Sequence, residues 1–304
     1  MSLRAGLKVS LRRNVLLSQY TTMQVGGPAD LFAEPVNEEE LAEALDFARQ
    51  DQIPFVILGK GSNSVFPDEG YPGLVISLLQ FEKKRIVFDT ERAFVRASGG
   101  VFLYGFVLAC RDQGLAGMEF LSNIPGTIGG AVVMNAGFSR FAGQKMEIGD
   151  LVQEVTVLQY DGQRRVLSRN ELEFSYRRSN LKDCVVVEAG LQLMRRPKDE
   201  IDREIKACFS FRNAKQDLRY PSSGSIFKNP PAPAPAAAAM IDQLGLKGTR
   251  VGGMMVSEKH GNYFVNVGQA KCSDLVQLIQ NIQEKVFHEK GVWLEPEVRI
   301  VPKP

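Results

Sequence analysis

Residues 55–64 read Phe-Val-Ile-Leu-Gly-Lys-Gly-Ser-Asn-Ser, an apolar run followed at once by a glycine-rich turn. An apolar run of this length, bounded by Pro54 and Gly59, predicts a short strand. The small residues after it predict a tight turn whose backbone another molecule can approach closely. This stretch therefore predicts a strand followed by a tight turn, and the neighbouring elements are placed relative to it.

A helix is expected before this strand and a second strand after it. Asn37, with Glu40 three positions later, forms a capping-box pattern at the start of a segment with apolar residues at helical spacing. The helix should end near residues 50–51, because Pro54 prevents its continuation. Residues 73–78 predict another strand, so the segment is a β-α-β unit with a glycine-rich turn after its central strand.

The remainder of the chain also alternates between strand and helix patterns. We expect a hairpin from strands at 85–89 and 93–97, strands at 151–160, 184–194 and 292–301, and helices at 101–112, 199–212 and 236–244. A last helix should begin at a Ser273 cap and stop at Gly291. A domain boundary is expected at 194–198, and the alternation indicates the α+β or the α/β class.

Composition limits the kinds of function. The chain has 304 residues, which is more than one core usually fills, and its net charge is +2 without a long basic block, so nucleic acid is not expected as a partner. No apolar run is long enough to cross a bilayer, so we expect no membrane insertion. Residues 1–14 lack the apolar core of a secretion signal, which predicts a cytoplasmic protein.

The chain has 4 cysteines and 2 histidines, and their spacing does not predict a metal site. The cysteines at 110, 184, 208 and 272 are too dispersed for a zinc knuckle or a Cys-x-x-Cys pair, so we expect reduced, mostly buried thiols. A catalytic triad would have to use His260 or His288.

Residues 59–64 fit neither of two well-known phosphate-binding motifs. Position 54 is Pro where a P-loop needs Gly, and Ser64 stands where a dinucleotide fingerprint has its third glycine. Small residues still let backbone N–H groups converge on an anion. A second glycine-rich loop at 124–131 suggests two loops that hold the diphosphate of a dinucleotide cofactor, and two ordinary tight turns are an equal alternative.

Residues 221–230, Pro-Ser-Ser-Gly-Ser-Ile-Phe-Lys-Asn-Pro, form another unusual loop. Prolines at both ends restrict the backbone, and Gly224 permits a conformation that presents the hydroxyl of Ser225 from a rigid turn. Taken alone, the loop is better interpreted as an ordinary turn with solvated serines.

Seven ordered segments resemble the UDP-N-acetylenolpyruvoylglucosamine reductase (MurB) family over residues 14–301. They are residues 21–30 (Thr-Thr-Met-Gln-Val-Gly-Gly-Pro-Ala-Asp), 58–63 (Leu-Gly-Lys-Gly-Ser-Asn), 124–131 (Ile-Pro-Gly-Thr-Ile-Gly-Gly-Ala), 176–179 (Tyr-Arg-Arg-Ser), 224–230 (Gly-Ser-Ile-Phe-Lys-Asn-Pro), 245–248 (Gly-Leu-Lys-Gly) and 296–299 (Pro-Glu-Val-Arg). The Pro-Ser-Ser-Gly-Ser loop resembles the shorter type II branch.

The resemblance implies an α+β fold. A FAD-binding domain of the vanillyl-alcohol-oxidase/PCMH type would comprise residues 1–78, to which the C-terminal strand could return, and residues 79–196. A C-terminal α+β domain, 197–304, would close over the substrate. The family uses non-covalent FAD and NADPH as co-substrate to reduce the enolpyruvyl group of a UDP-sugar in peptidoglycan synthesis. We expect this UDP-sugar and NADPH as the small-molecule partners, and a monomer.

The resemblance also assigns residues to the site. The catalytic residues would be Arg177 as a cation for the substrate carboxylate, Ser225 as proton donor and Glu297 as the assisting carboxylate, whereas Glu295 should lie on the opposite side of its strand. Cofactor contacts are expected from Leu58, Gly59, Lys60, Gly61, Ser62, Asn63, Ser64, Ser122, Ile124, Pro125, Gly126, Gly129, Gly130, Ala131 and Asn135. Substrate contacts are expected from Tyr176, Arg212, Lys215, Lys228 and Asn229.

Two segments depart from the family pattern, and two other functions stay open. At 260–263, His-Gly-Asn-Tyr has glycine where alanine is usual, and residues 230–239 are unusually rich in proline, so the shape of both loops is not predicted. An oxidase of the same flavoprotein superfamily is disfavoured, because residues 1–200 hold no histidine that could tether FAD. A nucleotide-sugar binding module without redox turnover is the alternative from another class.

Overall fold

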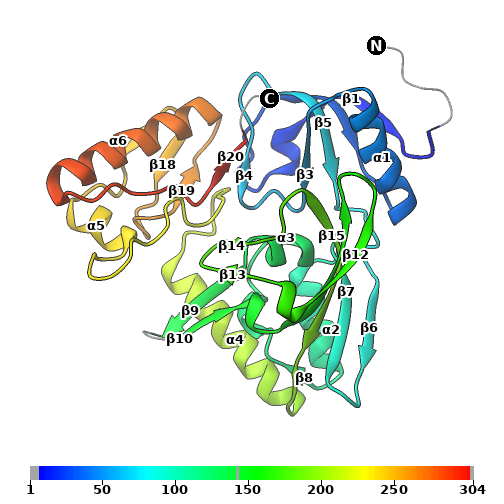
Figure 1. The fold of residues 1–304 in the computed structure, drawn as a ribbon. Coiled ribbons are helices and arrows are strands. Elements are labelled where there is room, and N and C mark those ends of the chain that lie inside the picture. Colours follow the sequence, from blue (N-terminus) through cyan, green and yellow to red (C-terminus); the bar gives the residue numbers. More distant parts are fainter. Residues whose placement is uncertain (1–6, 142–143, 302–304) are drawn as a thin grey trace. The chain divides into compact units, whose positions relative to one another are not determined.

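The computed structural model describes residues 7–141 and 144–301, and the chain forms two compact units. The first unit comprises Met1–Arg12, Leu31–Lys60 and Gly73–Arg212, and the second comprises Arg13–Asp30, Gly61–Pro72 and Asn213–Pro304. The predicted domains 1–78 and 197–304 include residues 1–6 and 302–304, which lie outside the described residues. Figure 1 shows the elements of both units in chain order.

The predicted β-α-β segment is present. The N-terminal sheet has the strand order β1-β2-β5-β3, formed by β1 (Leu11–Leu16), β2 (Pro28–Ala33), β5 (Tyr71–Ser77) and β3 (Phe55–Leu58), and β3 pairs with β5 in parallel. Helix α1 (Glu38–Gln50) begins as predicted, because Oδ1 of Asn37 accepts the backbone N–H of Glu40 at 2.9 Å. In return, Oε2 of Glu40 accepts the N–H of Val36, one residue before the cap, at 3.0 Å.

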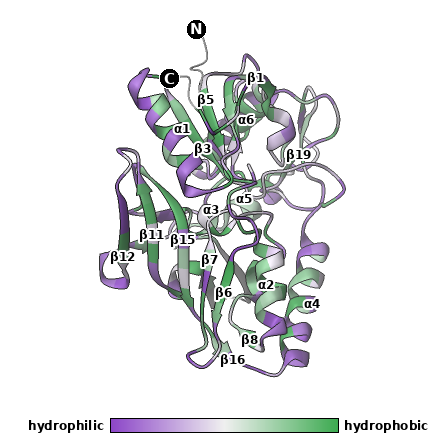
Figure 2. Ribbon diagram, turned by 90° about the vertical axis from the view of Figure 1, so that its right-hand side faces the viewer, coloured by the Kyte–Doolittle hydropathy of each residue, from purple (hydrophilic) through white to green (hydrophobic). Residues whose placement is uncertain are grey.

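A five-stranded antiparallel sheet forms the centre of the first unit. Its order is β12-β11-β15-β7-β6, with β12 (Arg164–Ser168), β11 (Val152–Gln159), β15 (Cys184–Gln192), β7 (Phe94–Ser98) and β6 (Ile86–Asp89). The predicted hairpin of β6 and β7 is confirmed, as are the long strands β11 and β15. Figure 2 shows the change from the hydrophilic edge strand β12 to the hydrophobic β11 beside it.

Three helices pack on this sheet and complete one hydrophobic core. They are α2 (Leu103–Asp112), α3 (Ile128–Val133) and α4 (Lys198–Lys215). Phe106, Ile128 and Ile201 contribute one buried side chain from each helix. Figure 2 shows α2 and α4 on the same side of the sheet. The sequence predicted α2 and α4 within a few residues, whereas the short α3 lies inside what looked like a glycine-rich loop.

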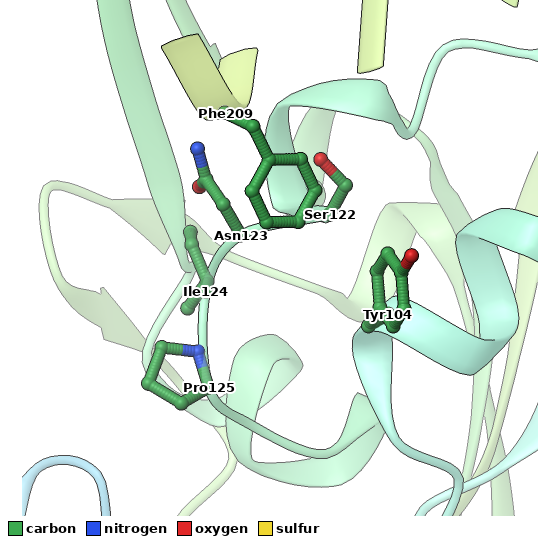
Figure 3. Close-up of a pocket in the computed structure, with 6 residues that line it drawn as sticks. All are labelled: Tyr104, Ser122, Asn123, Ile124, Pro125 and Phe209. Carbon is green, nitrogen blue, oxygen red and sulfur yellow. The ribbon is translucent and has the colours of Figure 1, made fainter. Parts of the chain in front are cut away.

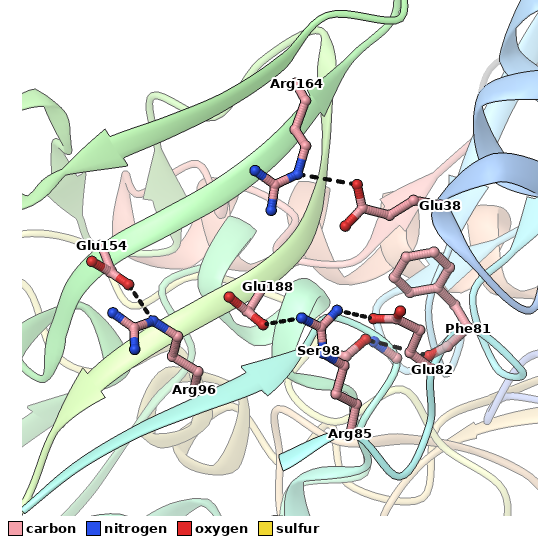
Figure 4. Close-up of polar contacts among 10 residues, drawn as sticks. Glu38, Phe81, Glu82, Arg85, Arg96, Ser98, Glu154, Arg164 and Glu188 are labelled. Atoms are coloured by element: carbon pink, nitrogen blue, oxygen red, sulfur yellow. Dashed lines mark hydrogen bonds and ion pairs between the residues drawn. The ribbon is translucent and has the colours of Figure 1, made fainter. Parts of the chain in front are cut away.

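Ion pairs join neighbouring elements on the surface of the first unit (Figure 4). Nε of Arg164 on β12 lies 3.1 Å from Oε2 of Glu38 on α1, and Nε of Arg96 lies 2.6 Å from Oε1 of Glu154. Arg85 contacts both Glu82 and Glu188. These side chains are partly exposed, so each pair contributes only about 0–1 kcal/mol to stability.

Several short elements were not predicted. They include the strand pairs β8 (Leu115–Ala116) with β16 (Met194–Arg195), β9 (Gly137–Phe141) with β10 (Gln144–Glu147), and β13 (Phe174–Ser175) with β14 (Arg178–Ser179), and the 3₁₀ turns Leu17–Tyr20, Glu119–Leu121, Ile148–Asp150 and Arg169–Glu171. The β13–β14 hairpin matters most for function, because its two-residue loop is Tyr176–Arg177.

The second unit combines a small sheet with two helices. Strands β17 (Arg250–Val251), β18 (Met254–Val256) and β19 (Phe264–Asn266) form the sheet, α5 (Ala237–Gln243) and α6 (Cys272–Lys290) pack in the same core, and β4 (Ser64–Val65) pairs in parallel with β20 (Arg299–Ile300). The expected strand at 292–301 is therefore only partly formed.

The start of α6 differs from the prediction and its end agrees with it. Ser273 is not the cap: the N-cap residue is Lys271, and the helix N-terminus is bound by a residue distant in sequence. Oδ1 of Asp68 accepts the N–H of Cys272 at 2.6 Å and its Oδ2 accepts the N–H of Ser273 at 3.0 Å. The helix ends at Gly291 in the left-handed conformation, with φ of 68°, as predicted.

Candidate active site

Arg177 lies at the tip of a tight hairpin in the first unit. Its φ is +58°, a left-handed conformation that non-glycine residues rarely adopt and that the second of the two central residues in a type II turn requires. Nη2 of Arg177 donates to the carbonyl oxygen of Gly137 at 3.3 Å, and the guanidinium carbon lies 5.0 Å from the ring centroid of Tyr176. Backbone strain of this kind persists where the surrounding structure holds it, and it is common at functional sites.

Asn135 supports this hairpin through hydrogen bonds of its side chain. The side chain is only 1% exposed, and Nδ2 donates to Oε2 of Glu147 at 2.9 Å and to the carbonyl oxygen of Ser175 at 3.0 Å. Oδ1 accepts the N–H of Gly149 at 3.0 Å. Both amide hydrogens therefore bond within the protein. The predicted cofactor contact of Asn135 would have to use its remaining carbonyl lone pair or its backbone.

The first glycine-rich loop begins in the first unit, where its Gly59 meets the second loop, whereas residues 61–64 belong to the second unit. A Cβ atom placed on Gly59 would lie 2.8 Å from Oγ1 of Thr127, which is closer than such atoms normally approach. Oγ1 of Thr127 also caps α3 by accepting the N–H of Gly130 at 3.5 Å. Among the described residues, the backbone N–H groups of Gly59 and Lys60 have no protein partner. This geometry leaves backbone donors available to an anion beside the start of α3.

Not every donor of the second loop is available. The N–H of Ile128 bonds to the carbonyl oxygen of Val101 and the N–H of Gly129 to that of Gly99, both at 2.9 Å. A Cβ atom on Gly129 would lie 3.2 Å from the oxygen of Gly99. Gly129 is therefore needed for close packing of α3 on the chain, which is a structural role in addition to the predicted cofactor contact.

A hollow of about 380 Å³ lies next to the second loop (Figure 3). It is lined by Tyr104, Ser122, Asn123, Ile124, Pro125 and Phe209. Ser122 is 2% exposed, and its Oγ has no hydrogen-bond partner among the described residues. Nδ2 of Asn123 donates to the carbonyl oxygen of Cys208 at 2.9 Å, which fixes the loop to α4. A buried hydroxyl without a partner is costly, so Ser122 is suited to receive a hydrogen bond from a ligand or to donate one to it.

Two aromatic residues that line this hollow were not predicted as site residues from the sequence. The rings of Tyr104 and Phe209 meet edge to face, with centroids 5.8 Å apart. Tyr104 comes from α2 and Phe209 from α4, and each was interpreted only as part of a helix. No motif marks them, because their proximity arises from the packing of α2 and α4.

Ser225 and Glu297 lie on neighbouring segments of the second unit. The backbone N–H of Glu297 donates to the carbonyl oxygen of Ile226 at 2.7 Å, and Phe227 forms an antiparallel bridge with Pro296. On its other side, Ser225 forms an antiparallel bridge with Tyr263. The residues 225–228 thus form the middle of three extended segments, and the structure brings together two of the three predicted catalytic residues. Arg177 belongs to the first unit.

Gly224 shapes the turn before Ser225. Its φ is +79°, and its N–H donates to Oγ of Ser222 at 3.2 Å. A residue with a side chain would be strained here, which supports the prediction of a rigid turn. Oγ of the neighbouring Ser223 is buried and has no partner among the described residues.

Two predicted substrate contacts already have protein partners. Nζ of Lys228 lies 2.5 Å from Oε1 of Glu295, and its N–H donates to the carbonyl oxygen of the same residue at 2.8 Å. Oδ1 of Asn229 accepts the N–H of Ala237 at the start of α5 at 3.1 Å. The amide hydrogens of Asn229 and the remaining hydrogens of the Lys228 ammonium are the groups that a ligand could use.

Cationic side chains gather near His260 in the second unit. Burial lowers the pKa of His260, and the positive charges of Lys215 and Lys247 lower it further, whereas Asp242 opposes this effect. His260 is therefore neutral at pH 7. Lys215 was a predicted substrate residue, but Lys247 was not, although it lies in the Gly-Leu-Lys-Gly segment that carried the resemblance. Arg212, another predicted substrate residue, belongs to the first unit.

The described residues contain no cluster of three or more His, Cys, Asp or Glu side chains that could bind a metal ion. Burial raises the pKa of the Cys110 thiol, and burial together with Asp68 and Glu69 raises that of Cys272 to about 11. These thiols are therefore poor nucleophiles at neutral pH. Within the described part of the chain, no helix is both long and apolar enough to span a membrane.

Comparisons with known proteins agree with this geometry. Residues 29–168 match the family model of a FAD binding domain, and residues 216–301 match that of the UDP-N-acetylenolpyruvoylglucosamine reductase C-terminal domain. The UDP-N-acetylenolpyruvoylglucosamine reductase of Moorella thermoacetica is 41% identical over 98% of this chain and 95% of its own length. That of Syntrophus aciditrophicus is 43% identical over 94% and 90%.

A solved structure is similar over nearly the whole chain. The crystal structure of UDP-N-acetylenolpyruvylglucosamine reductase (MurB) from Thermus caldophilus has a TM-score of 0.80 and 36% identity, and the match covers 97% of this chain and 99% of that one. The α+β class and the FAD-binding domain expected from the sequence are thereby confirmed. With both family models matched in order and relatives this similar over almost their full length, the chain belongs to the UDP-N-acetylenolpyruvoylglucosamine reductase family.

Proposed function

We propose that this chain reduces the enolpyruvyl group of UDP-N-acetylglucosamine-enolpyruvate to give UDP-N-acetylmuramate, with FAD as non-covalent cofactor and NADPH as co-substrate. The observation that supports this most directly is the pairing of the segments that carry Ser225 and Glu297, because the reaction needs a proton donor and an assisting carboxylate. The product is a precursor of peptidoglycan.

Residues of the two glycine-rich loops fit FAD. Gly59 has no room for a Cβ atom beside Thr127, and the buried Oγ of Ser122 lacks a partner within the described structure. Cofactor contacts are assigned to the glycine-rich loops and their neighbours: Leu58, Gly59, Lys60, Gly61, Ser62, Asn63, Ser64, Ser122, Ile124, Pro125, Gly126, Gly129, Gly130, Ala131 and Asn135. FAD, when bound, supplies the redox centre that takes two electrons from NADPH and passes them to the substrate.

Arg177 stabilises the negative charge that develops on the substrate. When the terminal carbon of the enolpyruvyl group gains a hydride, the electron pair of the double bond moves to the adjacent carbon and its carboxylate. A guanidinium stays protonated and can bind a carboxylate through two parallel hydrogen bonds. The hydrogen bond from Arg177 to the carbonyl oxygen of Gly137 and its contact with the Tyr176 ring orient the guanidinium, which supports this role.

Ser225 completes the reaction by moving a proton. Its Oγ gives a proton to the carbon next to the carboxylate, a C–H bond forms as the O–H bond breaks, and the resulting alkoxide takes a proton from solvent. A serine hydroxyl is a weak acid, so the rigid turn at Gly224 and a nearby cation must compensate. Glu297 assists the charge delocalisation or the proton relay from the adjacent segment.

The UDP portion is assigned to residues with amide, hydroxyl or cationic groups: Tyr176, Arg212, Lys215, Lys228 and Asn229. Lys228 and Asn229 are held by Glu295 and by the start of α5, so they can meet a diphosphate in a preset orientation. The division into residues 1–78, 79–196 and 197–304, the type II branch, a cytoplasmic location and a monomeric state stay predictions.

The colour of the purified protein tests the proposal. The protein should show a flavin spectrum that is lost under anaerobic NADPH and returns when the enolpyruvyl UDP-sugar is added, and mass spectrometry should detect UDP-N-acetylmuramate. A colourless protein that binds the UDP-sugar without turnover would instead indicate a binding module. Loss of colour that returns only with oxygen would indicate an oxidase.

A further inference from the structure

Asn262 connects the catalytic segment to the loop that departs from the family pattern. The residue is 3% exposed and lies in the His-Gly-Asn-Tyr segment. Its Oδ1 accepts the N–H of Phe227 at 2.9 Å, and its Nδ2 donates to the carbonyl oxygen of the same residue at 2.8 Å. One side-chain amide thus satisfies both polar groups of the Phe227 backbone, as a neighbouring strand would.

The backbone of Asn262 makes a further bond to the same segment. Its carbonyl oxygen accepts the N–H of Ile226 at 3.0 Å, and its own N–H donates to Nδ1 of His260 at 3.2 Å. Ile226 is therefore held from both sides, because its carbonyl oxygen accepts the N–H of Glu297. Ser225 immediately precedes this doubly held residue.

Within the described structure, the N–H and C=O groups of Phe227 depend on the Asn262 side chain, although its neighbours Ile226 and Lys228 also bond to the segment of Glu297. Phe227 is fully buried, so water cannot replace the bonds that the Asn262 side chain makes. Without the amide, the N–H and C=O groups of Phe227 would be unpaired in the core, and the segment would shift to find partners. Such a shift would move the hydroxyl of Ser225 relative to Glu297.

We propose that Asn262 is a positioning residue for the proton transfer, which it serves by fixing the Ser225–Phe227 backbone through its side-chain amide. The proposal rests on the role proposed above for Ser225. Asn262 acts on the reaction only through Ser225. It should therefore affect the reduction of the UDP-sugar and leave the earlier reduction of the flavin by NADPH nearly unchanged.

Asn266 offers a matched control in the same unit. It is also a buried asparagine, 9% exposed, and its side chain also bonds to backbone groups: Nδ2 donates to the carbonyl oxygen of Met23 at 3.1 Å and Oδ1 accepts the N–H of Gly268 at 3.0 Å. Within the described structure, its side chain bonds to Met23, Gln24 and Gly268 and not to residues 225–228. Asn266→Ala should thus reproduce the general loss of stability without displacing Ser225.

The experiment measures both half-reactions by stopped-flow absorbance of the flavin for Asn262→Ala, Asn262→Asp, Asn266→Ala and Ser225→Ala. In Asn262→Ala, we expect oxidation by the UDP-sugar to slow about 100-fold, with reduction by NADPH within about twofold of the parent protein. Asn262→Asp should be intermediate, because burial opposite a carbonyl oxygen favours the protonated acid, which can accept from the Phe227 N–H and donate to its carbonyl oxygen, with poorer geometry than the amide.

Two further readouts separate positioning from a merely structural role. The solvent deuterium isotope effect on the UDP-sugar half-reaction should increase in Asn262→Ala, because proton transfer becomes more rate-limiting. The affinity for the UDP-sugar, measured by the change in flavin absorbance on binding, should stay close to the parent value. The thermal unfolding temperature should fall by a similar amount in Asn262→Ala and Asn266→Ala.

The outcomes are distinguishable. If Ser225→Ala slows the second half-reaction but Asn262→Ala behaves like Asn266→Ala, the positioning role is wrong and that of Ser225 stands. If Ser225→Ala keeps a normal second half-reaction, the role of Ser225 itself is wrong. If Asn262→Ala does not fold, Asn262→Asp carries the test, and an unchanged isotope effect and second half-reaction in that variant would overturn the proposal.

Discussion

The backbone N–H of Glu297 bonds to the carbonyl oxygen of Ile226 at 2.7 Å, so two segments separated by about seventy residues of chain form one extended pair. Ser225 immediately precedes Ile226. Its hydroxyl group and the carboxylate of Glu297 thus come from adjacent backbone segments. The main-chain geometry of the second unit sets the arrangement.

Replacement of Ser225 by alanine should slow the second half-reaction and leave the first nearly intact. The hydroxyl is proposed to donate a proton only after the substrate has gained a hydride, so its loss should cost several orders of magnitude in that step alone. Rapid-mixing measurements of flavin reduction by NADPH and of flavin oxidation by the UDP-sugar separate the two steps. An equal loss in both would refute the role of Ser225.

Ser223 provides a control two residues away in the same loop. Its Oγ is buried, 7% of the residue is exposed, and no described residue bonds to this oxygen. Ser223→Ala removes an unsatisfied polar atom, so we expect the free energy of unfolding to rise by up to about 1 kcal/mol and both half-reactions to persist. If Ser223→Ala and Ser225→Ala slow the second step equally, the loop as a whole is responsible rather than the hydroxyl of Ser225.

Replacement of Arg177 by lysine should also impair the second half-reaction. An ammonium keeps the charge but cannot reproduce the planar fork that binds a carboxylate through two hydrogen bonds. We expect a loss of about 10-fold or more in the rate of flavin oxidation by the UDP-sugar. Arg178→Lys, at the exposed neighbouring position, is the matched control and should react at the parent rate. Near-normal turnover of Arg177→Lys would argue against the assignment.

Local signals in the sequence were sufficient for many elements. Asn37 and Glu40 marked the start of α1, and Gly291 marked the end of α6, because these caps involve residues close together in the chain. The start of α6 was predicted wrongly at Ser273, because the acceptor of its first N–H groups is Asp68, which is about two hundred residues away. No pattern around Ser273 could reveal that bond.

The site shows the same difference between local and distant contacts. Ser225 and Glu297 were predicted as catalytic residues because their segments resemble family motifs. The turn at Gly224 was predicted from the conformational freedom of glycine. The side chains of Asn135 and Asn262 bond to backbone atoms that are distant in the sequence, at Ser175 and Phe227. Such bonds produce no periodic pattern in the sequence. They could only be found once the tertiary packing was known.

A methyl group on Gly59 should weaken retention of FAD. The added Cβ atom would lie 2.8 Å from Oγ1 of Thr127, so Gly59→Ala must displace the hydroxyl that caps α3 or separate the two glycine-rich loops. We expect a lower ratio of flavin to protein absorbance after purification, and a larger rise in thermal unfolding temperature when FAD is added back. Gly105→Ala is the control, because a Cβ atom there meets no atom within 4 Å and alanine favours the helix. Parent-like flavin content in Gly59→Ala would show that the loops tolerate the added methyl group.

Replacement of Asp68 by alanine should destabilise the protein at neutral pH and much less in acid. Burial alone would raise the pKa of this carboxyl group, but the hydrogen bonds from Ser273 and Cys272 and the charge of Lys271 lower it below its ordinary value. A carboxyl group with a lowered pKa in the folded state stabilises the fold above its unfolded pKa, and this contribution is lost as the pH falls through the folded pKa. By analogy with other helix caps, we expect Asp68→Ala to cost about 1 kcal/mol at pH 7. Urea unfolding at pH 7 and near pH 3 measures the difference between parent and variant, which should shrink at the lower pH, whereas Asp68→Asn should keep part of the stability at both. A difference that is equal at the two pH values would mean that the charge of Asp68 does not support the start of α6.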